Sequence, residues 1–184
     1  MPPRILTVNG QIGARIESLR PGSGVVIAEW QLGREVIAWI WQTLRDRSPV
    51  VSGDYKRGHL LFADGALVEE GQKIPNASTF KFINAVPYAR KIEIGKTKSG
   101  RSFVVQVEPR IYERTYKDAK GRFGNIAQIS TGFEPAPSGY SLKKNQAHRS
   151  FSGKGMRVSK RQRPDRVAGS AVSVPFILVS LRSA

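Results

Sequence analysis

The feature that most limits how this chain can fold is a 35-residue stretch with very few aliphatic side chains. It covers residues 135–169, is rich in Ser, Gly, Pro, Lys and Arg, and shows neither helical nor strand periodicity. Such a stretch cannot supply a hydrophobic core, so the core must come from the residues on either side of it. As a free chain we expect it to be mobile. It is either a solvated linker or tail, or an arm that becomes ordered against nucleic acid or an acidic neighbour.

The chain becomes apolar again after this stretch. Residues 171–181 (AVSVPFILVSL) predict a strand, with Pro175 at an edge or a bulge. A strand at this place indicates that the chain returns to a sheet, either its own or that of a neighbouring subunit. We therefore expect a core domain in residues 1–134, a basic extended arm or loop in residues 135–170, and a returning C-terminal strand in residues 171–184.

The positive charge of the chain is concentrated in its second half. The 184 residues carry a net charge of +16, yet residues 1–80 hold nine basic and eight acidic side chains. Residues 81–122 have a net charge of +7, and residues 143–166 have a net charge of +8. A surface of this kind attracts polyanions or acidic partners. The candidate contacts for a DNA backbone or a partner are Lys96, Lys98, Arg101, Lys143, Lys144, Arg149, Lys154, Arg157, Lys160, Arg161, Arg163 and Arg166.

The composition and motifs disfavour an enzyme. The chain has no cysteine, which excludes a disulfide framework, a thiol nucleophile and cysteine-ligated metal. Its two histidines do not stand in a zinc-binding pattern, and no phosphate-binding loop or nucleophile elbow occurs. His59 begins an apolar segment, and the sequence suggests neither a nucleophile nor an orienting partner for it. We predict no catalytic residue, no metal and no cofactor.

The core segments predict an α+β fold, in which an antiparallel or mixed sheet packs against one long amphipathic helix and one or two shorter helices. Hairpins are expected at Asn9-Gly10 and Asp64-Gly65. The long helix is expected over residues 25–47, capped by Ser23, with Trp30 and Trp41 on its buried face. Further strands are expected at residues 79–84, 103–107 and 126–133, a polar loop at 48–58, and shorter helices after Pro87 and over 109–120.

Two segments, taken in order, carry a family resemblance. The first, residues 48–58 (SPVVSGDYKRG), directly follows the predicted long helix. The second, residues 82–95 (FINAVPYARKIEIG), comes about thirty residues later. This order resembles the tail-completion (neck) proteins of long-tailed bacteriophages, whose first motif is Pro-Val-x-Thr-Gly-x-Leu-Arg and whose second is Asn-x-x-x-Tyr-Ala-x-x-x-Glu-x-Gly. The matching positions are Pro49, Gly53, Asn84, Tyr88, Ala89, Glu93 and Gly95, while Ser52 and Tyr55 depart from the first motif.

The resemblance covers roughly residues 25–120 and implies a structural role. It implies a ring subunit, hexameric in form, which joins the head connector (adaptor) to the tail terminator or tail tube around the DNA channel. Such a protein is located in the virion neck and is assembled in the host cytoplasm, and the sequence has no apolar run long enough to span a membrane. The start of the sequence also lacks a secretory signal pattern, which favours the same expectation.

The matching residues also suit structural roles by their own chemistry. Asn84 can cap the turn that follows its strand, Gly95 can end a short helix in the left-handed conformation, and Gly53 can do the same for the first turn. Tyr88 and Ala89 would offer a large and a small side chain for packing against a sheet. The alternative hypothesis is a nucleic-acid-binding protein of the ribosome- or nucleoid-associated type, which would contact the backbone without reading the sequence.

Overall fold

A computed structural model describes residues 4–30, 32–50, 52–95, 108–137, 139–146, 149–152, 155–158 and 163–181. The strands of the main sheet are β4 (His59–Ala63), β5 (Ala66–Val68), β6 (Thr79–Asn84), β7 (Ala127–Pro135) and β10 (Ser173–Leu181). The α-helices are α1 (Leu32–Asp46), α2 (Asp54–Arg57), α3 (Ala89–Ile94) and α4 (Ile111–Phe123). The fold is α+β, as the sequence predicts.

The C-terminal strand is an inner member of the protein's own five-stranded sheet. The strand order is β5-β4-β6-β10-β7, and every neighbouring pair is antiparallel. β10 pairs with β7 along its full length and with β6 from Phe176 onward. Pro175 lies just before the residues of β10 that pair with β6. Its missing N–H group therefore removes no hydrogen bond between β10 and β6. The predicted return to a sheet is therefore confirmed, and the sheet is the chain's own.

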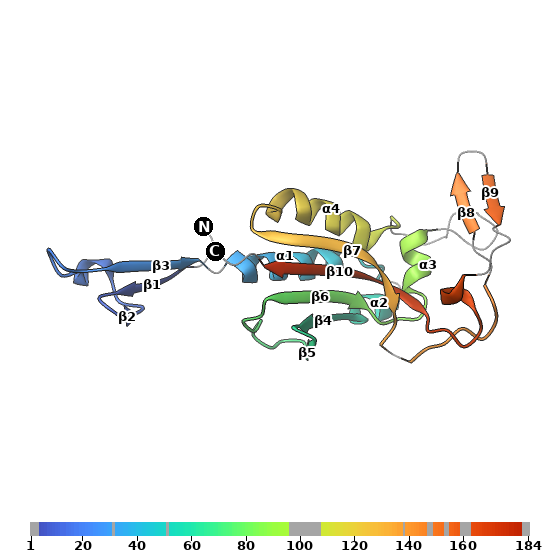
Figure 1. Ribbon diagram of the computed structural model, residues 1–184, viewed down its shortest axis with the longest axis horizontal. Coiled ribbons are helices and arrows are strands. Elements are labelled where there is room, and N and C mark those ends of the chain that lie inside the picture. Colours follow the sequence, from blue (N-terminus) through green and yellow to red (C-terminus); the bar gives the residue numbers. More distant parts are fainter. Residues whose placement is uncertain are drawn as a thin grey trace.

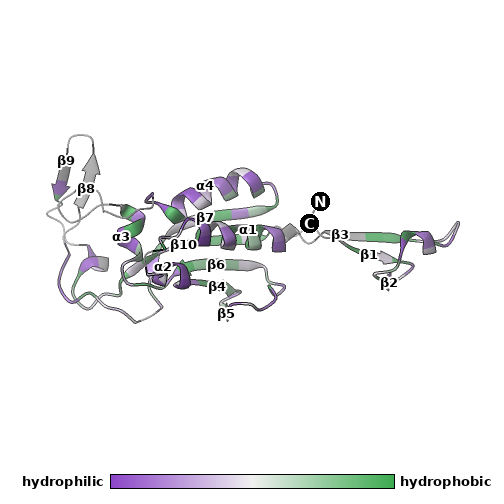
Figure 2. Cartoon of the chain, turned by 180° about the vertical axis from the view of Figure 1, so that it is seen from behind, coloured by the Kyte–Doolittle hydropathy of each residue, from purple (hydrophilic) through white to green (hydrophobic). Residues whose placement is uncertain are grey.

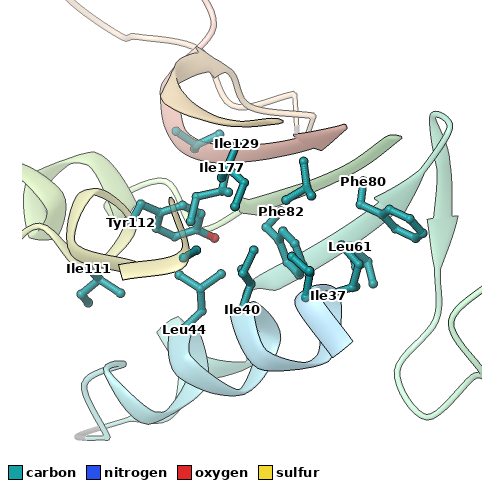
Figure 3. Close-up of a cluster of buried hydrophobic side chains, with 14 of the residues drawn as sticks. Ile37, Ile40, Leu44, Leu61, Phe80, Phe82, Ile111, Tyr112, Ile129 and Ile177 are labelled. Carbon is teal, nitrogen blue, oxygen red and sulfur yellow. The ribbon is translucent and has the colours of Figure 1, made fainter. Parts of the chain in front are cut away.

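The core lies between one face of this sheet and the helices α1 and α4. Figure 3 shows Ile37, Ile40 and Leu44 of α1 directed towards Phe82 and Ile177 on the strands. All five of these side chains are completely buried. The sequence places the α1 residues at three- and four-residue steps, so one helical face can cover the sheet.

A second, smaller sheet stands apart from this core. It consists of β1 (Arg4–Val8), β2 (Gln11–Ile12) and β3 (Val26–Trp30), in the order β2-β1-β3, and a 3₁₀ turn, η1 (Ile16–Ser18), follows β2. Asn9 and Gly10 have φ angles of 52° and 82°, so the predicted hairpin is confirmed. We call residues 4–30 the projecting sheet, because Figure 1 shows them extending along the long axis of the molecule, away from the main sheet.

The predicted long helix over residues 25–47 is too long at its N-terminal end. Residues 26–30 form β3, which pairs in register with all five residues of β1, and the helix begins only at Leu32. Ser23 therefore does not cap the helix, and Trp30 lies in a strand. Val26 and Ile27 are β-branched, and pairing with β1 outweighs the weak helical pattern of this segment.

The other segments mostly follow the prediction. Asp64 and Gly65 have positive φ angles of 45° and 87° in the second hairpin, β6 spans the predicted residues, and α4 and β7 match within a few residues. The stretch 48–58 is not wholly a loop, because α2 forms within it and buries Tyr55. The strand predicted at residues 103–107 lies outside the described residues.

The described parts of the basic stretch contain more regular structure than the sequence predicts. Residues 140–146 run antiparallel to residues 166–172, joined by an isolated bridge between Ser141 and Ala171 and by backbone hydrogen bonds such as Gln146 N to Arg166 O at 2.8 Å. We call these two segments the stem. Beyond it, β8 (Arg149–Ser152) and β9 (Gly155–Val158) form a hairpin, and a second 3₁₀ turn is η2 (Pro164–Arg166). The stem is thus a two-stranded continuation of the β7–β10 pair. Its order comes from backbone hydrogen bonds, which the pattern of side chains does not predict.

Within the described residues, no helix is both long and apolar enough to cross a lipid bilayer.

Candidate functional site

The stem gathers several of the predicted cationic residues at one end of the molecule. Lys143, Lys144, Arg157 and Arg163 are exposed there, and Arg166 is half-buried. We call these five residues the basic end. Figure 1 shows that the stem, the β8–β9 hairpin and η2 lie near α3, opposite the projecting sheet. Residues as far apart in the sequence as Lys143 and Arg166 are thus brought together because the stem pairs residues 140–146 with residues 166–172.

The remaining predicted contacts are not located. Lys96, Lys98, Arg101, Lys154, Lys160 and Arg161 lie outside the described residues. Arg149 belongs to β8, but its side chain also lies outside the described part. The basic end is therefore defined by five of the twelve predicted residues.

Among the side chains that the structure describes, which do not include that of Asp165, three cations of the basic end have no carboxylate partner. The ion pairs of the described residues use other cations, for example Arg47 with Asp118 and Arg122 with Glu35. None of them includes Lys143, Lys144 or Arg157. An exposed cation without a carboxylate can neutralise a phosphate without first breaking an ion pair. The described part of the basic end contains no α-helix that could enter a groove, so its contacts with nucleic acid would be to the backbone rather than to base edges.

The residues of the second motif lie inside the fold and join β6, α3 and α4. Asn84 is completely buried; its Nδ2 donates to the carbonyl of Tyr55 at 2.9 Å, and its Oδ1 accepts from the N–H of Val86 at 3.1 Å. The second contact closes the turn that leads from β6 towards α3, so the predicted capping role of Asn84 is confirmed.

Glu93 caps the N-terminus of a helix that is distant in sequence. Its carboxylate accepts the backbone N–H groups of Tyr112 at 3.0 Å and Glu113 at 2.9 Å, both in the first turn of α4. The first N–H groups of a helix have no partner within the helix, and the positive end of the helix dipole attracts a carboxylate. Glu93 is only 6% exposed, and burial raises its pKa although these hydrogen bonds act in the opposite direction.

The other motif residues shape the backbone around this joint. Gly95 has a φ of 69° and ends α3, as predicted, and a side chain there would overlap Pro109. Ala89 is completely buried and Tyr88 packs partly buried against the core. In the first motif, Pro49 is buried, and Gly53 has a φ of 73°, but it precedes α2 rather than ending a helix.

A buried polar cluster, which the sequence does not predict, joins α1, β4 and α4. His59 Nε2 lies 2.7 Å from Ser48 Oγ, and His59 Nδ1 lies 2.9 Å from the hydroxyl oxygen of Tyr112. Ser48 also donates to the carbonyl of Leu44 at 2.7 Å. Because Ser48 has a single hydroxyl hydrogen, Nε2–H donates to Ser48 and the Tyr112 hydroxyl donates to Nδ1. The two hydroxyl hydrogens and the imidazole hydrogen then have one acceptor each.

The geometry of this cluster suits a structural tether better than a catalytic pair. Ser48 and His59 are only 3% and 4% exposed, so a substrate has no approach to the serine oxygen in this conformation. Burial, with a smaller contribution from the charge of Arg45, lowers the pKa of His59 to about 3. The neutral imidazole therefore persists across the physiological pH range. Only the fold brings together residues that are 11 and 53 positions apart, and for this reason no local pattern indicates a partner for His59.

The chain matches no protein-family profile, and neither a curated protein nor a solved structure is significantly similar to it.

Proposed function

We propose that this protein is a structural subunit of the neck of a long-tailed bacteriophage, where it forms a ring that joins the head connector to the tail around the DNA channel. Support comes first from the two sequence motifs and their order along the chain. Support comes also from the places that the motif residues occupy, since a motif that serves the scaffold should be buried and joined to other elements rather than exposed in a cleft.

The observation that carries the proposal is the joint built by the second motif. Asn84 fixes the turn after β6, Gly95 ends α3, and Glu93 connects α3 to the first turn of α4. These three roles need an amide, a glycine and a carboxylate at fixed spacing, which is the spacing of the family motif. The structural roles of these three residues account for the motif, and no catalytic role is needed to explain it.

The basic end suits a protein that surrounds a duplex. Its exposed cations could face phosphates in the channel, or acidic surfaces of the neighbouring neck proteins, and both kinds of contact tolerate any DNA sequence. A ring through which a genome passes needs such tolerance, because a base-specific contact would hold the DNA at one place.

The test is to locate the chain in the phage particle and to remove the hairpin that the stem carries. Replacing residues 149–158 by a short Gly-Ser linker leaves the stem and the core in place. We expect this variant to fold and to be unable to join heads to tails, so that full heads and separate tails accumulate. Particles that assemble normally with no copy of this chain would disprove the proposal.

The alternative is a nucleic-acid-binding protein that acts outside a virion, and the observation that favours it is the same set of exposed cations. It differs in one measurable respect. An isolated monomer should then bind duplex DNA or RNA tightly at about 50 mM salt, with affinity that falls steeply as salt increases. A soluble monomer that does not bind under these conditions would exclude the alternative.

A further inference from the structure

The projecting sheet leaves apolar side chains uncovered. Ile12 is 79% exposed and Ile27 is 51% exposed. Thr7 of β1 pairs with Ile12 on one side and with Ile27 on the other, so the three side chains form one row on one face of the sheet. Figure 2 shows hydrophobic segments along β1 and β3, with the short turn η1 near one end of the sheet and no α-helix over it. A sheet with an apolar face is ordinarily stabilised by a second layer that covers it.

The main sheet offers an apolar cleft on the face opposite its helices. The cleft has a volume of about 430 Å³, and its lining includes Phe62, Ile83 and Leu178. These residues alternate along their strands with residues that face the helices, such as Leu61, Phe82 and Ile177, so they belong to the other face of the sheet. On that face Phe62 and Leu178 are half-buried, and Ile83 is buried at the bottom of the cleft. Leu67, on β5, stands directly opposite Phe62 and is 52% exposed, which extends the apolar surface to the sheet edge.

Charge identifies what these two surfaces can contact. Among the described residues that line the cleft, only Lys81 and Glu134 are charged, and their Nζ and Oε2 atoms form a 3.0 Å ion pair, so the cleft has no net charge. The row formed by Thr7, Ile12 and Ile27 is uncharged. Copies of a chain with a net charge of +16 repel one another, so they can associate only through surfaces that lack this excess. A polyanion, by contrast, would be drawn to the basic end.

We propose that the projecting sheet of one copy packs into the cleft of the next copy. Figures 1 and 2 show that the projecting sheet extends away from the main sheet, and so it does not cover the cleft of its own chain. A contact between two different surfaces is heterologous, and it produces a closed ring when the rotation between copies closes. In the ring proposed above, this contact would join neighbouring subunits, and to that extent it rests on the proposed function. The observations behind the contact are the two apolar surfaces and their lack of net charge.

The first test measures self-association of the full chain by sedimentation velocity. The double variant Ile12→Asp/Ile27→Asp places charges on the projecting sheet, and Leu67→Asp places one on the apolar surface beside the cleft, next to Phe62. We expect each variant to raise the dissociation constant at least about tenfold, since a carboxylate would have to be buried in an apolar contact. Val50→Asp is the matched control, because Val50 is 73% exposed and belongs to neither surface. It should associate like the unchanged chain.

Mixing the two variants distinguishes the proposed contact from a symmetric one. The Leu67→Asp variant retains an intact projecting sheet, and the double variant retains an intact cleft. Their mixture should form heterodimers, and these should not grow into rings, because each heterodimer has only one productive contact. If the projecting-sheet variant abolishes association and Leu67→Asp has no effect, the cleft is not the receptor and the proposal is wrong.

Disulfide cross-linking tests directly whether the two surfaces touch, because the chain has no cysteine of its own. Ile27→Cys and Leu67→Cys in one chain should form disulfide-linked ladders under mild oxidation, whereas each single variant should not exceed background. A chain that remains monomeric at every concentration, or a double-cysteine variant that forms no ladder, would overturn the inference. A chain that forms ladders yet is absent from virions would disprove only the proposed function.

Discussion

The carboxylate of Glu93 accepts the backbone N–H group of Tyr112 at 3.0 Å, across 19 positions of sequence. A second bond, to the N–H group of Glu113, makes Glu93 the cap of α4. The same helix supplies the Tyr112 hydroxyl that donates to His59. One short helix, α3, thus fixes the start of α4, and α4 in turn completes the buried polar cluster at the end of α1.

Replacing Glu93 by Ala should reduce the free energy of unfolding by about 2 kcal/mol or more, because one buried and one partly buried N–H group lose their acceptor. The measurement is urea denaturation followed by circular dichroism. Glu113→Ala is the control on the same helix turn. The side chain of Glu113 is 38% exposed and contacts Lys117 at the surface, so its loss should change the unfolding free energy by less than about 0.5 kcal/mol. Equal losses for the two variants would contradict the capping role.

Replacing Gly95 by Ala should destabilise the protein by about 2 kcal/mol or more. The φ of 69° disfavours any side chain, and a methyl group would overlap Pro109. For Gly121 the same substitution should have the opposite effect on stability. Gly121 lies in α4, and a methyl group added there would meet no atom within 4 Å. Gly121→Ala should stabilise the helix by roughly 0.5–1 kcal/mol. Thermal denaturation of both variants checks the pair, and a Gly95→Ala protein as stable as the parent would disprove the left-handed stop.

Acid should weaken the fold through His59. Its pKa is about 3 in the folded protein and 6.5 in a free side chain, so below pH 6.5 the unfolded chain takes up a proton that the folded chain excludes. The contribution is complete above pH 6.5 and is lost as the pH falls towards 3, by about 1.4 kcal/mol per pH unit.

The raised pKa of Glu93 has the opposite effect, since it makes the folded state more stable as the pH falls. The effect of His59 is therefore measured as the difference between the parent chain and a variant that lacks this histidine. Between pH 6.5 and 4.5 the parent chain should lose about 2 to 3 kcal/mol more than the His59→Gln variant. Urea midpoints measured across this range supply the difference. If the two proteins show parallel pH profiles, His59 is not buried as described.

Removing three cations of the basic end should weaken binding to duplex DNA without affecting stability. The triple variant Lys143→Ala/Lys144→Ala/Arg157→Ala should reduce the slope of log affinity against log salt by about 2 to 3, if each side chain neutralises one phosphate. Lys73, Lys117 and Lys120 are also exposed, and their triple replacement by Ala removes the same charge from other surfaces. Fluorescence anisotropy at several salt concentrations compares the two. Equal slopes would show that the basic end is not the contact.

The elements predictable from the sequence are those whose signals are local. The Asn9-Gly10 and Asp64-Gly65 turns, the alternation in β6 and the periodicity of α4 each lie within a few residues, and each appears where it is expected. The error at residues 26–30 has a nonlocal cause. Val26 and Trp30 fit the helical steps that follow them, and only the pairing of β3 with β1 makes this segment a strand.

The candidate site shows the same division. The motif residues could be predicted to shape turns, because Asn84 and Gly95 act on adjacent backbone. The partner of Glu93 could not be predicted, because its N–H groups belong to a helix 19 positions away. Likewise, a composition without periodicity does not reveal that residues 140–146 pair with residues 166–172, since those hydrogen bonds are made by the backbone and leave no pattern in the side chains.

Cryo-electron microscopy of the assembled phage particle can decide whether this chain is a neck subunit. We predict a closed ring of copies at the junction of head and tail, with the projecting sheet of each copy against its neighbour. Intact, infectious particles whose head–tail junction contains no density for this chain would contradict the proposed role.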